Sequence, residues 1–150
     1  MSKRMCKKFD TWFECSAKFV NDIDGTTKKR KVCVEAISFA EAENWALHYF
    51  MNDFGLSLSE LRITNISIAS YTEVYFRERC EVWFKASMKS LSGEKDVVLL
   101  SAQNIVDAHD TLEEEIIGPA QQWNITKLEQ TDIIAVVSHE AIIYEEAPTE

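Results

Sequence analysis

The sequence predicts an α+β fold made of a tandem duplicated β-β-α-β(β) unit with pseudo-twofold symmetry, in antiparallel sheets with one helix each. Two observations predict it: an internal repeat, and the same order of hydrophobic periodicities in both halves. A chain of 150 residues with 46% hydrophobic and 27% charged residues has the size and composition of one globular domain. We therefore expect a single domain over residues 1–150, built of repeats over about 9–78 and 79–140 and a short acidic tail over 141–150.

Three segments of the first half match three segments of the second half in the same order. The pairs are WFECSAK (12–18) with WFKASMK (83–89), VEAISFAEA (34–42) with LSAQNIVDA (100–108), and ITNI (63–66) with ITKL (125–128). The number of residues that separates the matched positions falls from 71 in the first pair to 66 in the second and 62 in the third. Each fall comes where a loop would absorb a deletion, so the matches indicate a duplication.

Each half begins with a pattern typical of a β-hairpin. Apolar and polar residues alternate along 12–19 and along 82–89, which predicts a strand with one apolar face. A polar turn follows each strand and contains Gly25 in the first half and Gly93 in the second. Return strands are expected over 29–37 and 95–102.

A helix and further strands complete each half. Ser38 with Glu41, and Asn104 with Asp107, are capping pairs that start a helix at the same aligned position. The second helix should end at 118–119, where Gly is followed by Pro. We expect the last strands over about 61–76, bent near residue 70, and over about 124–138, broken near residue 131.

Charge and cysteine usage restrict the partners and the compartment. A net charge of −9 disfavours adhesion of the whole surface to nucleic acid or to an anionic membrane, but it permits a local basic face. The apolar runs fall far short of the ~20 residues of a membrane-spanning helix, and no secretory signal is recognisable. The four cysteines show no C-x-x-C spacing. We expect reduced thiols in a cytoplasmic protein with no membrane partner.

The residues that carry enzyme chemistry do not form a recognisable constellation. The four glycines lie 25 or more residues apart, so a glycine-rich phosphate loop is excluded. The densest set of metal-ligating side chains is Asp107, His109 and Asp110, a pattern more typical of a solvated helix start. The consecutive carboxylates at 113–115 point to different helix faces. The sequence therefore predicts no catalytic residue, no metal site and no cofactor.

The polar face of the first strand of each half combines a large aromatic residue with lysines. Proteins that bind single strands without sequence preference stack bases on aromatic rings and contact phosphates with lysines. The return strand of the first half adds two lysines to the first face. The candidate nucleic-acid-binding residues are Trp12, Lys18, Lys29, Lys31, Trp83, Lys85 and Lys89.

Two other interpretations of the tryptophans stay open. Trp12 and Trp83 are equivalent in the repeat, which suits burial where the two halves, or two copies of the chain, pack together. Either ring would also suit a hot spot for a protein partner. Exposure of the two rings separates these interpretations from base stacking.

The quoted segments resemble a small family of unknown function. They are W-F-E-C-S-A-K at 12–18, K-K-R-K-V-C-V-E-A-I-S-F-A-E-A-E at 28–43 and R-I-T-N-I at 62–66. The family is one of Bacteroides-type gut bacteria and their tailed phages. The resemblance is best over residues 12–44 and looser to about residue 137. It implies phage or mobile-element biology, and it supplies no activity and no site residues.

These observations lead to one main functional hypothesis and one alternative. The main hypothesis is a non-enzymatic, phage- or mobile-element-associated protein that binds single-stranded nucleic acid through basic and aromatic sheet faces. The alternative is an acidic interaction or counter-defence protein that inhibits a host or phage protein through its acidic surface or tail. Both agree with the cytoplasm of a bacterial host, and both leave monomer and homodimer open.

Overall fold

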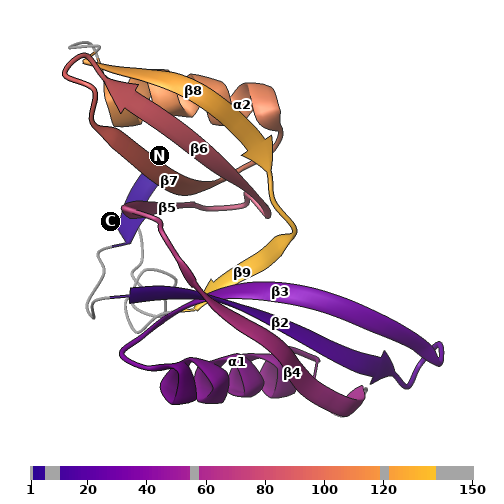
Figure 1. Cartoon of the computed structure of the whole chain (residues 1–150). Helices are drawn as coiled ribbons and strands as arrows, with labels where there is room; N and C mark the ends of the chain where they lie inside the picture. The colour runs from indigo at the N-terminus through magenta and orange to yellow at the C-terminus, as the bar shows by residue number, and fades with distance from the viewer. Residues whose placement is uncertain (1, 6–10, 55–57, 119–121, 138–150) are drawn as a thin grey trace, which may run out of the picture. The chain divides into compact units, whose positions relative to one another are not determined.

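The computed structural model describes residues 2–5, 11–54, 58–118 and 122–137, and within them it confirms an α+β fold (Figure 1). The expected acidic tail at 141–150 lies outside the described residues. The elements in chain order are β1 (Ser2–Met5), β2 (Thr11–Asn21), β3 (Thr26–Ala36), α1 (Phe39–Phe54), β4 (Leu58–Ala69), β5 (Glu73–Arg77), β6 (Val82–Ser90), β7 (Lys95–Ala102), α2 (Ile105–Thr111), the π-helix η2 (Leu112–Ile117), β8 (Trp123–Gln130) and β9 (Ile133–Val137).

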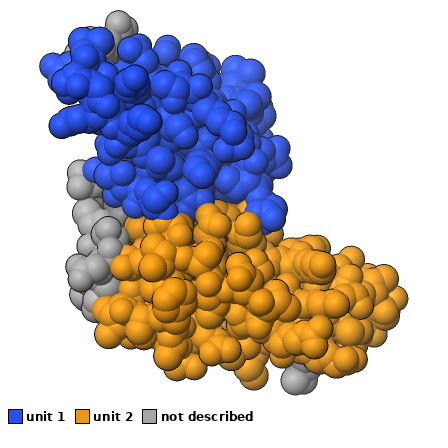
Figure 2. All heavy atoms as spheres, in the orientation of Figure 1, with its two compact units in different colours: residues 1–6, 70–132 blue, residues 7–69, 133–150 orange. Residues whose placement is uncertain are grey.

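The chain divides into two compact units, which Figure 2 colours separately. Unit 1 comprises residues 1–6 and 70–132, and unit 2 comprises residues 7–69 and 133–150. The units therefore differ from the two sequence repeats. The difference arises because the last strand of each repeat, β5 or β9, joins the sheet formed by the hairpin of the other repeat.

Unit 2 is a four-stranded sheet in the order β4-β2-β3-β9, with α1 along one face (Figure 1). The alternation in β2 sends one side chain in two toward that helix, as the sequence predicts. Phe13, Cys15 and Phe19 are at most 3% exposed and belong to one apolar cluster with Ala46 and Phe50 of α1. Burial of this stripe under the helix drives the unit's folding.

Unit 1 repeats this arrangement in the order β8-β6-β7-β5, with β1 added beside β5. Phe84, Ala86 and Met88 of β6 form its apolar cluster with Ala108 of α2 and Leu112 of η2. The second helical segment starts as an α-helix and continues as the π-helix η2, a change that the sequence did not indicate. No helix in the part of the chain that the structure describes is long and apolar enough to cross a membrane.

The strand register confirms the duplication. In unit 2, Val32 of β3 lies opposite Ala135 of β9, and in unit 1, Val98 of β7 lies opposite Glu73 of β5. Val32 and Val98 on the return strands are 66 positions apart, and Glu73 and Ala135 on the last strands are 62 positions apart. These are the offsets that align the two repeats. Both of these pairs are parallel, so each sheet is antiparallel except for one pair.

The helix starts and the chain breaks follow the sequence signals. The Ser38 hydroxyl accepts the backbone N–H of Glu41 at 3.1 Å, and the Asn104 side chain accepts that of Asp107 at 2.8 Å. The second helical segment ends at Gly118, whose φ of +76° suits a residue without a Cβ. The bends expected near residues 70 and 131 fall in the short connectors between β4 and β5 and between β8 and β9.

Candidate functional site

Three cations lie side by side on the sheet of unit 2, on the face opposite α1 and toward the turn between β2 and β3. Lys18 of β2 is directly opposite Lys29 of β3 on one side and Arg62 of β4 on the other. Directly opposed residues of neighbouring antiparallel strands project to the same side of the sheet. Because neighbouring strands are about 4.7–4.9 Å apart, the three residues span about 10 Å. We call Arg62, Lys18 and Lys29 the cation row.

The cation row has no carboxylate partner among the residues that the structure describes, whereas nearby cations do. Lys31 Nζ lies 3.7 Å from Glu14 Oε1, and Lys28 Nζ lies 3.7 Å from Asp24 Oδ2. Lys29 and Arg62 are exposed and Lys18 is half-buried. Like charges placed directly opposite each other destabilise a sheet. The row therefore places three positive charges side by side, none of them in an ion pair with a described carboxylate, and the Glu60 side chain lines the hollow next to Lys18 and Arg62.

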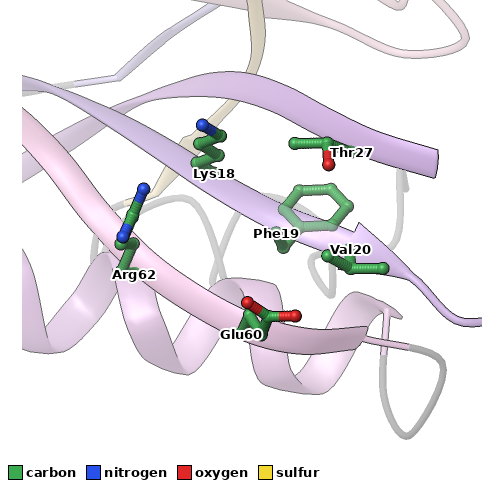
Figure 3. A pocket seen from close by; sticks show the side chains of 6 residues that line it. All are labelled: Lys18, Phe19, Val20, Thr27, Glu60 and Arg62. Carbon is green, nitrogen blue, oxygen red and sulfur yellow. The ribbon is translucent and has the colours of Figure 1, made fainter. Parts of the chain in front are cut away.

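A hollow of about 170 Å³ lies beside the row. It forms where β4 carries a bulge between its pairings Arg62 with Lys18 and Ser59 with Val20, and Glu60 in that bulge has a φ of +54°. Figure 3 shows the side chains of Lys18 and Arg62 directed to the same side of their strands. The residues that line the hollow are Lys18, Phe19, Val20, Thr27, Glu60 and Arg62.

Unit 1 carries an equivalent of the row. Lys89 of β6 is directly opposite Lys95 of β7 and Asn124 of β8. These three residues are the repeat equivalents of the cation row. The offsets of 71, 66 and 62 that align the repeats place Lys18, Lys29 and Arg62 on Lys89, Lys95 and Asn124, respectively. Lys89 and Lys95, which we call the second lysine pair, are exposed and make no ion pair with a carboxylate in the described ranges. The duplicated fold thus presents opposed lysines in both units.

The sequence left the exposure of Trp12 and Trp83 open, and in the structure both rings are buried, which removes base stacking on them. Trp12 is 1% exposed and Trp83 is 4% exposed, so no base can stack on either ring. Alternation assigned both residues to the correct side of their strands, since each is adjacent to a residue of the helix-side cluster. However, this side is buried at the Trp12 end of the sheet, where Cys33 and Glu35 of β3 are at most 1% exposed.

The predicted lysines fall into three sets: members of the two lysine surfaces, one lysine paired with a carboxylate, and Lys85, which has no ion pair in the described ranges. Lys18 and Lys29 belong to the cation row and Lys89 to the second lysine pair. Lys31 is held by the Glu14 carboxylate. Lys85 is half-buried and lies opposite Glu129, whose carboxylate is 3.6 Å from the ammonium of a different lysine, Lys127.

Sequence reasoning missed Arg62 and Lys95. The available signal was the same alternation: Arg62 stands between Leu61 and Ile63, which pack toward α1, so it must face away from the helix. Placing it next to Lys18 needed the strand register, which a bulge in β4 shifts. Lys95 needed the register of the second hairpin in the same way.

The two thiols of the first hairpin, Cys15 and Cys33, are not suited to nucleophilic chemistry near neutral pH. Burial raises the pKa of Cys15 from 9.0 to about 12, and complete burial raises that of Cys33 well above its ordinary value. The two thiols lie on opposite faces of the hairpin, because Cys15 pairs with Val32 and Cys33 with Glu14. Among the described residues, no three His, Cys, Asp or Glu side chains gather as metal ligands would.

Together, the fold and this face define a class: a duplicated α+β protein with equivalent cation-bearing sheet surfaces. The chain belongs to the family of the domain of unknown function DUF4494, whose sequence pattern matches residues 11–139. This confirms the resemblance to an uncharacterised family. No curated protein and no solved structure matches the chain significantly.

Proposed function

We propose that the protein binds single-stranded nucleic acid without transforming it, through phosphate contacts of the cation row. The observation that carries the proposal is the row itself: three opposed cations with no carboxylate partner in the described part of the chain. Bound phosphates neutralise such charges and release counterions, which favours the complex. Ligand binding thereby offsets the repulsion that the unbound sheet carries.

The shape of the face favours a single strand over a duplex. Reading a duplex groove takes a protruding helix or ribbon, whereas the cation row lies across a sheet beside a shallow hollow. A flexible single strand can fit successive phosphates to cations spaced about 4.7–4.9 Å apart. Because both tryptophans are buried, base stacking on them contributes nothing. We therefore expect binding that is sequence-tolerant and strongly dependent on salt.

The remaining features support the biological setting that we propose. A net charge of −9 confines nucleic-acid contact to local surfaces such as the row. The resemblance to a family of Bacteroides-type bacteria and their tailed phages supports an accessory role in phage or mobile-element replication. We place this role in the cytoplasm of the bacterial host.

The test compares two double variants in a fluorescence-anisotropy titration of labelled oligo-dT. The row variant carries Lys18→Gln and Lys29→Gln. The opposite-face variant carries Lys28→Gln and Arg30→Gln, which remove two charges from the same hairpin but on the α1 side, opposite Phe19 and Ala17. We expect the row variant to lose at least about tenfold in affinity at low salt and the opposite-face variant to change little. No binding by the unmodified protein, or an equal loss in both variants, would refute the proposal.

A second candidate function is contact with a host or phage protein. The observation that favours it is an exposed aliphatic residue at the tip of each hairpin: Ile23 is 83% exposed and Leu91 is 77% exposed. Large exposed apolar side chains suit a protein partner better than a phosphate backbone. Replacing both by Ser should release a host protein that the unmodified chain retains, and it should leave oligo-dT binding unchanged.

A further inference from the structure

We propose that the second lysine pair of unit 1 is a second phosphate-contact site, so that one nucleic-acid strand engages both units of the same chain. This inference rests on the proposed function of the cation row. It follows from the register: the fold places Lys89 opposite Lys95 just as it places Lys18 opposite Lys29. The second pair is exposed and therefore accessible to a strand in solution.

The charges around the second lysine pair leave it available. Asp96, the next residue after Lys95, lies opposite Met88 and so projects to the helix side, where its Oδ1 accepts the Thr72 hydroxyl at 3.1 Å. On β8, the carboxylate of Glu129 lies 3.6 Å from Lys127. Within the described ranges, neither of these carboxylates, nor that of Glu94 in the turn, forms an ion pair with the second pair.

The second site should be the weaker of the two. Asn124 occupies the position that Arg62 holds in the cation row, so two cations stand in place of three. The Asn amide can donate a hydrogen bond to a phosphate oxygen but contributes no charge. A short strand should therefore bind to unit 2 in preference to unit 1, and loss of the second pair should scarcely change its affinity.

A longer strand should gain affinity from both sites. Within the described residues, the short connectors between β4 and β5 and between β8 and β9 join the units, so both sites belong to one tethered molecule. Once the cation row holds a strand, contact with the second pair is intramolecular and benefits from a high effective concentration. The excess affinity for long over short strands should therefore depend on Lys89 and Lys95.

The experiment titrates the full chain with oligo-dT of roughly 6 and roughly 30 nucleotides, lengths that bracket one small binding surface. We expect the unmodified protein to bind the long oligonucleotide at least about tenfold more tightly. The variant Lys89→Gln, Lys95→Gln should lose most of this ratio of long-strand to short-strand affinity. Its affinity for the short oligonucleotide should stay within about twofold of that of the unmodified protein. The opposite-face variant removes the same charge and should keep the full ratio.

Two results would overturn the inference: the same long-to-short ratio in the Lys89→Gln, Lys95→Gln variant as in the unmodified protein, or no difference between this variant and the opposite-face variant. Failure of the proposed function would look different, because the unmodified protein would then bind neither oligonucleotide. Circular dichroism and urea unfolding of each variant confirm that the fold is intact, so a loss of affinity reports on binding.

Discussion

Replacing Lys18 by Gln should make the protein more stable. Lys18 is the central member of the cation row and has a like charge directly opposite it on both sides, Lys29 and Arg62. Favourable cross-strand pairs contribute about 0.2–1 kcal/mol, and we take the same range for the cost of a directly opposed like-charge pair. Lys18→Gln removes two such pairs and should raise the free energy of unfolding by about 0.4–2 kcal/mol. Lys29→Gln removes one pair and should give about half of that increase.

Urea unfolding at low and at high salt measures this effect. At about 1 M salt the Debye length falls to about 3 Å, so the repulsion is screened and the stability difference should nearly disappear. Lys28→Gln is the matched control, because it removes the neighbouring charge on the other face, where Lys28 lies 3.7 Å from the Asp24 carboxylate. Loss of this exposed ion pair should lower stability by at most about 1 kcal/mol.

A lower stability of Lys18→Gln at low salt would show that the three cations do not repel one another appreciably in the folded sheet. An increase that persists unchanged at high salt would mean that the gain comes from packing or strand propensity and not from relieved repulsion. Either result would remove the argument that the sheet carries repulsion which a ligand offsets.

Three further predictions concern buried and capping residues. Trp12→Ala and Trp83→Ala should each lower the free energy of unfolding by about 3–5 kcal/mol in urea titrations, because each ring is buried; unchanged stability with lost oligo-dT binding would contradict this. Cys15 should resist thiol reagents in the folded protein, since burial raises its pKa from 9.0 to about 12. Its protonated form stabilises the fold fully below about pH 9, and unfolding curves should show this contribution lost as the pH rises toward 12. Asp107→Ala should lower the free energy of unfolding by about 1–2 kcal/mol, because the carboxylate accepts the Gln103 N–H at 2.9 Å and lies 2.6 Å from Arg77 Nη1. Hydrogen bonds from these two groups lower the pKa of Asp107. Unfolding curves at falling pH should therefore show this stabilisation lost below the ordinary pKa of 3.8.

Local sequence patterns were enough to predict most of the architecture. The alternation through Phe13 and Phe84, the turns and the two capping pairs each depend on a few neighbouring residues, so the sequence alone predicted both hairpins and both helix starts. The repeat offsets also reappear in the strand register. The breaks between β4 and β5 and between β8 and β9 were visible as interruptions of the last strand patterns.

The parts that escaped prediction depend on distant segments. No local pattern shows that β5 pairs with β7 and β9 with β3, because these contacts join one repeat to the hairpin of the other. Alternation likewise placed Trp12 on the correct side of β2 but could not show that this end of the face is buried. Arg62 joined the candidate site only through a register that the bulge at Glu60 shifts.

If the cation row contacts phosphates, the affinity for a single strand must fall steeply as the salt concentration rises. The affinity for an oligo-dT of roughly 6 nucleotides is measured over a range of salt concentrations for the unmodified protein and for the triple variant Lys18→Gln, Lys29→Gln, Arg62→Gln. Each single-strand phosphate contact contributes about −0.7 to the slope of log affinity against log salt, so three contacts predict a slope of about −2. The triple variant should lose this slope together with most of the affinity, whereas an unchanged slope, or no binding by the unmodified protein at low salt, would contradict the account.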